Sequence, residues 1–288
     1  MCSINHELKI IYISLPKCGC TFISNILTKY YDFETVVLPN ENHKDFISFD
    51  KSTEIMYDVS KCNSIYGCPW TITEQGILRY DSSCKLYNYV MEMNNDKWSE
   101  YKKFTIIRNP YDKFISAWKH VIKKSKENDH NTKLLSLREY IDKSKSELYE
   151  FANFAYFHSH ILMYDHLLDV NNELHIDYIG TFENLNKDLC DILLKIGVDK
   201  IKHREELEEN KKYNVGAHAE YMEYYDDSIL EKVNEILQKD FDTFKQYKQV
   251  YSVEEMKKDS NKYLVSEEEF DQKNKALIQR LEKDGLII

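Results

Sequence analysis

The stretch Pro16-Lys17-Cys18-Gly19-Cys20-Thr21 combines the residue types that bind a phosphate or sulfate group. It follows the apolar run Ile10-Ile11-Tyr12-Ile13 and precedes a run with helical periodicity. A loop between a strand and a helix N-terminus collects backbone N–H groups at the positive end of the helix dipole. Gly19 allows a ligand to approach the backbone closely, Thr21 adds a hydroxyl and Lys17 adds a positive charge. We therefore expect an anion-binding loop at this point of the chain.

The order of these residues departs from the P-loop that binds ATP. The ATP loop has the pattern G-x-x-x-x-G-K-[ST], in which the lysine directly precedes the hydroxyl residue. Here the first glycine is missing and Lys17 lies two residues before Gly19. Taken alone, the stretch also fits a tight strand-to-helix turn with an exposed lysine.

A second stretch, Arg108-Asn109-Pro110-Tyr111-Asp112-Lys113-Phe114-Ile115-Ser116, follows the apolar run Phe104 to Ile107. An arginine at a strand end can bind a phosphate through two N–H groups, and the hydroxyl of Ser116 can join it. The alternative is an ion pair between Arg108 and Asp112, with Ser116 as an ordinary helical serine. These residues are thus a second candidate for phosphate binding.

Strands and helices alternate along the chain and can position both stretches. We predict strands at 8–13, 33–38, 104–107 and through residue 179, and helices at 21–30, 111–124, 134–168, 184–196, 226–244 and 266–284. This alternation predicts an α/β fold of the P-loop-like, three-layer type, with a central, mostly parallel sheet flanked by helices. In such sheets ligands bind at the carboxyl ends of the strands. We expect one domain over residues 1–250 and a charged, helical C-terminal extension over residues 251–288.

Composition excludes several classes of protein. The net charge of −10 argues against a nucleic-acid binder but permits a local cationic pocket. The apolar runs are shorter than the roughly 20 residues that a membrane span needs, and the N-terminus has no signal-peptide pattern. The seven cysteines form no tandem C-x-x-C pairs, which favours reduced thiols and no metal site. We expect a soluble, cytoplasmic protein with neither a membrane span nor a nucleic-acid partner.

Together the two stretches resemble the sulfotransferases that use 3′-phosphoadenosine-5′-phosphosulfate (PAPS). Their 5′-phosphosulfate loop has the pattern P-K-x-G-x-T, which residues 16–21 match, and their 3′-phosphate motif has the pattern R-[DN]-P-[YF]-[DE]-[RK]-x-x-S, which residues 108–116 match. Residues 177–185, and Asn214-x-x-x-His218 with the acidic and aromatic residues after it, resemble the carbohydrate (Golgi-type) branch. That branch typically carries a membrane anchor, which is not predicted here, and this favours a cytoplasmic enzyme. The resemblance covers roughly residues 8–248.

The resemblance implies a role for each residue that matches a motif. Lys17 would contact the sulfate and the bridging oxygen, while the first turn of the following helix would hold the 5′-phosphate. Arg108 and Ser116 would hold the 3′-phosphate, and Phe182 would contact the adenine. The expected PAPS-binding residues are Lys17, Cys18, Gly19, Cys20, Thr21, Phe22, Arg108, Ser116 and Phe182. No metal is expected.

The acceptor must also lose a proton to a general base. Related sulfotransferases often use a histidine or glutamate just after the second strand, where this chain has Glu41 and His43. We favour His43, because the unperturbed pKa of histidine, about 6.5, suits proton transfer near neutral pH, and we keep Glu41 as the alternative. Four other histidines could serve the acceptor or cofactor site: His120, His158, His160 and His218.

The predicted activity is the transfer of a sulfuryl group from PAPS to a hydroxyl or amine, with release of 3′,5′-adenosine bisphosphate. The acceptor is expected to be a carbohydrate, lipid or small metabolite. A P-loop kinase or NTPase and a non-catalytic nucleotide-binding module are the alternatives. The first of these lacks support, because the chain has neither a G-K-[ST] ending nor a convincing metal-binding aspartate after a strand.

Overall fold

The computed structural model describes residues 2–36, 70–72, 78–80, 100–128, 135–142, 162–167, 174–209, 221–260 and 267–288. The chain divides into two compact units. The first unit contains Met1–Ile107, Met163–Gly180 and Asp191–Val198, and the second contains Arg108–Leu162, Thr181–Cys190 and Asp199–Ile288.

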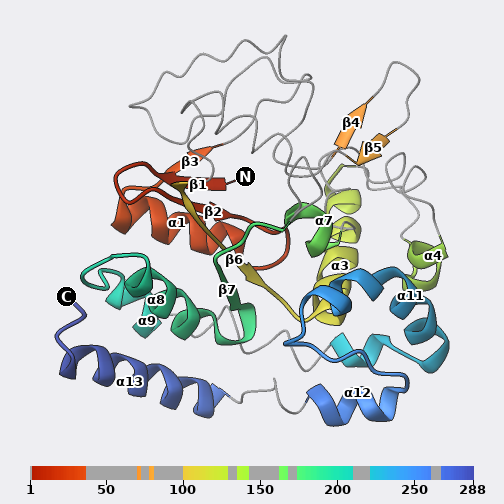
Figure 1. Cartoon of the computed structure of the whole chain (residues 1–288). Coiled ribbons are helices and arrows are strands. Elements are labelled where there is room, and N and C mark those ends of the chain that lie inside the picture. The colour runs from red at the N-terminus through yellow and green to blue at the C-terminus, as the bar shows by residue number, and fades with distance from the viewer. Residues whose placement is uncertain are drawn as a thin grey trace. The chain divides into compact units, whose positions relative to one another are not determined.

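A five-stranded sheet with the order β3-β1-β2-β6-β7 belongs mainly to the first unit (Figure 1). Its strands are β1 (Cys2–Asn5), β2 (Ile10–Ile13), β3 (Glu34–Val36), β6 (Lys102–Ile107) and β7 (Tyr178–Thr181). A separate pair of antiparallel strands consists of β4 (Trp70–Ile72) and β5 (Leu78–Tyr80).

The sheet is mixed but mostly parallel. Strand β2 runs parallel to β6, with Ile10 opposite Lys102, and the hydroxyl of Thr105 donates a hydrogen bond to the carbonyl oxygen of Ile13 at 2.8 Å. Strand β1 runs antiparallel to both β2 and β3, so β3, β2 and β6 share one direction. The predicted α/β fold class is therefore confirmed.

The predicted strand at residues 8–13 is wrong at its start. Residues 6–9 form a turn, and the strand begins at Ile10. Strand β1, which was not predicted, precedes this turn and pairs between β2 and β3. Its sequence, Cys-Ser-Ile-Asn, has a single aliphatic residue, so hydrophobic periodicity gives little signal for a strand whose place depends on pairing with two others.

Helix α1 (Cys20–Tyr31) packs against β1 and β3 within the first unit (Figure 1). Three apolar residues at helical spacing, Ile23, Ile26 and Leu27, are inaccessible to solvent or nearly so. Phe22 and Tyr30 are only partly buried. Tyr31 is buried instead, and its carbonyl oxygen accepts a hydrogen bond from the amide of Asn5 at 2.8 Å.

The structure describes helices at each of the ranges predicted as helical after residue 110. In the first unit the structure describes α7 (Met163–Leu167). In or mainly in the second unit it describes α3 (Pro110–Asn128), α4 (Leu137–Asp142), the 3₁₀ helix η4 (Phe182–Asn184), α8 (Leu185–Lys195), α9 (Arg204–Glu209), the 3₁₀ helix η5 (Met222–Tyr224), α11 (Asp227–Thr243), α12 (Val253–Ser260) and α13 (Glu267–Lys283). Pro110 opens α3, as its fixed φ favours. Helices α4 and α7 are the described parts of the helical region predicted at 134–168.

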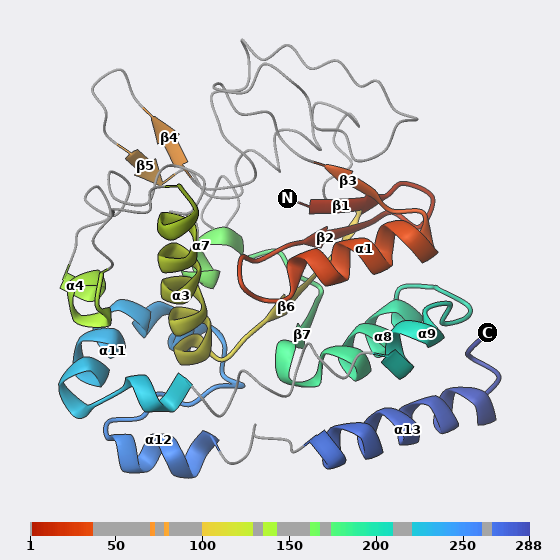
Figure 2. The ribbon, with the colours of Figure 1, turned by 180° about the vertical axis from the view of Figure 1, so that it is seen from behind.

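The end of the chain packs onto α9 within the second unit, beside the N-terminal part of α8 that belongs to the same unit (Figure 2). Leu277, Ile278 and Leu281 of α13 are buried, and each such side chain stabilises the fold by about 1.5–3 kcal/mol. After α13 the chain pairs with Ile201, whose N–H donates to the carbonyl oxygen of Leu286 at 2.6 Å. No helix in the described parts of the chain is long and apolar enough to cross a membrane. The proposed domain boundary at residue 250 stays a prediction.

Candidate active site

The loop between β2 and α1 has an unusual backbone. Lys17 has φ 68° and Gly19 has φ 77°, so both lie in the left-handed region. The N–H of Cys18 donates to the carbonyl oxygen of Leu15 at 3.2 Å and closes the turn. A left-handed conformation costs a non-glycine residue about 1–2 kcal/mol, so the position of Lys17 is maintained against an intrinsic preference.

The first turn of α1 is suited to an anion. The helix begins after Gly19, and no side chain caps it there. The first helical bond runs from the N–H of Ile23 to the carbonyl oxygen of Gly19, so the N–H groups of residues 20–22 precede the helical ladder. The first turn carries no acidic residue, whereas the first turns of α3, α8 and α11 each contain an aspartate. Thr21 is exposed in this turn.

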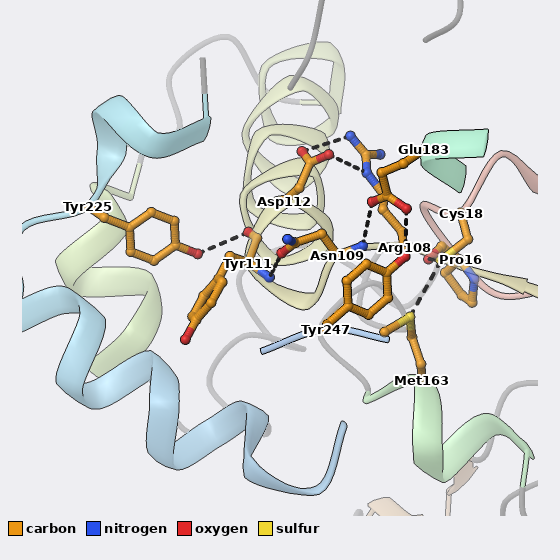
Figure 3. Close-up of polar contacts among 10 residues, drawn as sticks. All are labelled: Pro16, Cys18, Arg108, Asn109, Tyr111, Asp112, Met163, Glu183, Tyr225 and Tyr247. Carbon is orange, nitrogen blue, oxygen red and sulfur yellow. Dashed lines mark hydrogen bonds and ion pairs between the residues drawn. The ribbon is translucent and has the colours of Figure 1, made fainter. Parts of the chain in front are cut away.

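The two cysteines of the loop differ in exposure. The Cys18 thiol is buried and lies 3.6 Å from the carbonyl oxygen of Pro16 and 3.8 Å from the sulfur of Met163 (Figure 3). Cys20 is half-buried at the start of α1. The hydroxyl of Tyr12 is fully buried and has no hydrogen-bond partner among the residues that the structure describes. Burial, together with the thiols of Cys20 and Cys18, raises the pKa of this hydroxyl. Tyr12 is thus a neutral buried donor close to the loop, which sequence patterns did not identify.

Arg108 is the residue that directly follows β6, and it belongs to the second unit. Its guanidinium donates from Nε and Nη2 to the two carboxylate oxygens of Asp112, both at 2.8 Å (Figure 3). The ring of Phe182 lies 4.5 Å from the guanidinium carbon, at a distance typical of cation–π contacts. All three residues are buried, and none is more than 6% exposed. The structure therefore forms the ion pair that the sequence offered as the alternative to phosphate binding, and it brings Phe182 and Arg108 into contact.

The next residue, Asn109, is held by Glu183. The backbone N–H of Asn109 donates to Oε1 of Glu183 at 2.7 Å, and the hydroxyl of Tyr247 donates to Oε2 at 2.5 Å (Figure 3). Glu183 and Tyr247 are buried. The side chain of Asn109 in turn accepts a hydrogen bond from the N–H of Tyr111 at 3.0 Å, within the first turn of α3. Two consecutive residues of η4, Phe182 and Glu183, thus contact the two consecutive residues that precede α3.

Tyr111 attaches the start of α3 to α11 and to the chain after it. Its hydroxyl donates to the side-chain oxygen of Asn234 at 2.6 Å and accepts from the N–H of Val250 at 3.0 Å. The hydroxyl of Tyr225 donates to the carbonyl oxygen of Tyr111 at 3.0 Å. The centres of the Tyr111 and Phe241 rings lie 4.9 Å apart. Burial raises the pKa of Tyr111, so the hydroxyl keeps its proton. These contacts make the beginning of α3 a rigid part of the second unit.

The other predicted site residues are placed as follows. Ser116 is half-buried on α3, two turns after Arg108, and His120 lies one turn further on. Residues 16–22 belong to the first unit, whereas Arg108, Ser116 and Phe182 belong to the second. Five predicted residues lie outside the described residues: Glu41, His43, His158, His160 and His218.

Sequence reasoning missed the roles of Glu183 and Tyr247. Glu183 lies within the quoted stretch that ends in Thr-Phe-Glu-Asn-Leu, where an acidic residue between two apolar ones is the available signal. Tyr247 carries no such signal, because its partner lies 64 residues away. Among the residues that the structure describes, no three histidine, cysteine, aspartate or glutamate side chains form a group that could hold a metal ion.

Comparison with known proteins adds one finding. A model of the sulfotransferase family matches residues 2–248, which include β1, the loop before α1, the Arg108 stretch and η4. Searches against curated proteins and against solved structures found no match. Since the family model covers most of the 288 residues, the chain belongs to the sulfotransferase family.

Proposed function

We propose that the protein transfers a sulfuryl group from PAPS to an acceptor hydroxyl or amine. Family membership supports sulfuryl transfer in general. The choice of PAPS is supported by one observation above all: Lys17 and Gly19 form a left-handed turn at the start of a helix whose first turn carries no acidic residue. This arrangement suits a phosphosulfate, and the order of its residues differs from the ATP loop.

Each side chain then has a defined task. PAPS supplies the sulfuryl group when it is bound. Lys17 neutralises charge on the departing 5′-phosphate, and the N–H groups at the start of α1 hold that phosphate, with Gly19 allowing close approach. Arg108 and Ser116 hold the 3′-phosphate, with Phe182 beside the arginine. His43, or alternatively Glu41, takes the proton that the acceptor loses as its oxygen or nitrogen bonds to sulfur.

The ion pair between Arg108 and Asp112 limits how Arg108 could bind a 3′-phosphate. A guanidinium has five N–H donors, and Asp112 engages two of them. A 3′-phosphate must therefore use the other side of the guanidinium or displace the carboxylate.

The remaining assignments complete the proposal. Residues 1–250 form the sulfotransferase domain, and residues 251–288 form an extension to it. The acceptor is a small molecule or glycan, and transfer needs no metal. The protein is placed in the cytoplasm.

Nucleotide binding is the first test. We expect 3′,5′-adenosine bisphosphate to raise the melting temperature of the protein, because it offers both phosphates to the sites above. ATP with magnesium, measured side by side, should produce a much smaller shift. Stabilisation by ATP with magnesium and none by the bisphosphate would reverse the assignment in favour of a kinase or NTPase.

Replacing Lys17 by alanine tests its catalytic role. The acceptor is first found by screening sugars, phenols, alcohols and lipids for transfer of radiolabelled sulfate from PAPS. With that acceptor, Lys17→Ala should lower kcat by about 10²–10³, the usual effect of removing one group that stabilises developing charge. The matched control is Lys29→Ala, which removes an exposed lysine from the last turn of α1, the helix that follows the Lys17 loop. Undiminished transfer by Lys17→Ala would contradict the role, and failure of every acceptor class with PAPS would favour a non-catalytic binding module.

A further inference from the structure

Two neighbouring residues of η4 contact Arg108 and the residue after it. The ring of Phe182 lies 4.5 Å from the guanidinium carbon of Arg108. Oε1 of Glu183 accepts a hydrogen bond from the backbone N–H of Asn109 at 2.7 Å (Figure 3). All four residues belong to the second unit. Helix η4 is thus linked to Arg108 at two points, the guanidinium and the peptide bond that follows this residue.

The backbone N–H of Asn109 needs an acceptor from outside α3. The N–H of Lys113 donates to the carbonyl oxygen of Asn109 at 2.9 Å, so Asn109 stands at the start of the helical ladder, where N–H groups have no partner within the helix. The side-chain oxygen of Asn109 is engaged by the N–H of Tyr111 at 3.0 Å. Glu183 therefore supplies, from a distant part of the chain, the acceptor that α3 itself does not offer.

Tyr247 holds the other oxygen of the same carboxylate. Its hydroxyl donates to Oε2 of Glu183 at 2.5 Å, and both residues are buried (Figure 3). Tyr247 lies in a turn after α11, in which its N–H donates to the carbonyl oxygen of Phe244 at 3.1 Å. A glutamate side chain is long and flexible, so two hydrogen bonds restrict it more than one. The hydroxyl of Tyr247 thus limits the positions from which Glu183 can hold Asn109.

These contacts have a consequence for the direction of the Arg108 side chain. The peptide bond between Arg108 and Asn109 is planar, so a shift of the Asn109 N–H also shifts the backbone that carries Arg108. A planar guanidinium binds a phosphate best when its N–H groups point at the phosphate oxygens, and binding groups must be held to within about 0.5 Å for this purpose. We propose that Glu183 and Tyr247 are positioning residues, which set Arg108 for the 3′-phosphate of PAPS. This inference rests on the proposed function, in which Arg108 binds that phosphate.

Ligands with and without a 3′-phosphate separate this role from a purely structural one. 3′,5′-Adenosine bisphosphate carries the 3′-phosphate, whereas adenosine 5′-monophosphate (AMP) lacks it and otherwise has the same structure. A variant that only lowers the folded fraction weakens the apparent binding of both ligands by the same factor. A variant that misplaces Arg108 weakens the binding of the bisphosphate alone. The quantity to measure is therefore the ratio of the two affinities.

The test is isothermal titration of the full chain with both nucleotides, for the wild type and three variants. Tyr247→Phe removes the hydroxyl that holds Glu183, and Glu183→Asp shortens the side chain so that its carboxylate no longer reaches both partners. Neither change alters the charge of the protein, so a change in phosphate binding cannot come from lost or added charge. Tyr251→Phe is the matched control, because it removes an exposed hydroxyl four residues further along the chain.

We expect the wild type to bind the bisphosphate about tenfold or more tightly than AMP, the usual effect of charge-assisted hydrogen bonds to one group. In Tyr247→Phe and Glu183→Asp this preference should fall by about threefold to tenfold, while the affinity for AMP stays the same. The control variant should keep the preference of the wild type. If Glu183→Asp does not fold, Tyr247→Phe decides the question alone.

Two results would overturn the inference in different ways. If the wild type prefers the bisphosphate and Tyr247→Phe keeps the full preference, or loses affinity for both nucleotides equally, the two residues have a structural role only and the proposed function stands. If the wild type binds the bisphosphate no better than AMP, the 3′-phosphate site at Arg108 is wrong, and the positioning role fails with it.

Discussion

At the scale of single residues, Arg108 shows how the fold accommodates a buried positive charge. Asp112, one helical turn further on, balances its charge in a buried setting, and the face of Phe182 covers it from the η4 side. A buried arginine without an acidic partner would be costly, because its charge would lose its hydration with no counter-charge to compensate. The carboxylate therefore keeps the guanidinium in place.

Replacing Asp112 by asparagine tests this view. The variant keeps the size of the side chain but leaves Arg108 buried without its counter-charge, so the free energy of unfolding should fall by about 3–5 kcal/mol. If the proposed 3′-phosphate site is correct, 3′,5′-adenosine bisphosphate should raise the melting temperature of the variant more than that of the wild type, since its phosphate replaces the missing charge. Asp142→Asn breaks the exposed ion pair with Lys232 and is the control, with an expected loss of at most about 1 kcal/mol. An equal or smaller shift in the Asp112 variant would argue against phosphate binding at Arg108.

At the scale of elements, the junction of β7 and η4 organises the start of α3. Glu183 joins the N–H of Asn109, just before α3, to the hydroxyl of Tyr247, just after α11. Three elements that are distant in the sequence thus meet at one buried carboxylate. A network of this kind specifies one arrangement strongly, because each unsatisfied member would be costly.

The variant Glu183→Gln should weaken this junction. It loses the charge that strengthens both hydrogen bonds and places an amide donor against one of two existing donors, so we expect a loss of about 3 kcal/mol in urea unfolding. Tyr247→Phe removes the hydroxyl bond alone and should cost less, about 1.5–3 kcal/mol. Because the two residues share one network, the double variant should cost less than the sum of the single ones. Strict additivity would mean that the carboxylate and the hydroxyl act independently.

At the scale of the whole molecule, the net charge is negative, whereas the candidate anion-binding residues are positively charged. The chain carries a net charge of −10, yet the residues proposed to bind PAPS include the cations Lys17 and Arg108. Net charge therefore argues against binding of a long polyanion such as a nucleic acid, while individual sites stay suited to small anions.

Stability of the folded chain should depend on pH through His203. This side chain is fully buried beside Cys190, with their Nε2 and Sγ atoms 3.9 Å apart, and burial lowers its pKa to about 4 although nearby Glu206 opposes the shift. Between about pH 6.5 and 4 the unfolded chain binds a proton at this histidine that the folded chain does not, so stability falls as the pH falls. His203→Phe should show a shallower loss over this range, by up to about 1.4 kcal/mol per pH unit. Unfolding curves of both forms from pH 7 to 4.5 provide the measurement, and parallel slopes would exclude His203 as the source.

Local patterns in the sequence predicted much of the α/β architecture and the two candidate motifs. Strands β2 and β6 are short apolar runs, α1 and α11 have clear helical periodicity, and Pro110 marks a helix start. These signals act between neighbouring residues, so they are visible without a fold. The motifs around Lys17 and Arg108 are equally local, and the family match is consistent with that interpretation.

Other features depend on residues that meet only after folding. Strand β1 forms by pairing with both β2 and β3. The carboxylate of Glu183 accepts hydrogen bonds from residues 74 and 64 positions away in the sequence. From the sequence, Arg108 could be expected either to bind a phosphate or to pair with Asp112. The structure shows the ion pair with Asp112, and it places the Phe182 ring against the guanidinium. The side chains of Asn186 and Asn274 form a hydrogen bond although 88 residues separate them. Hydrophobic periodicity determines which segments become strands and helices, whereas side-chain packing in three dimensions determines which polar groups pair.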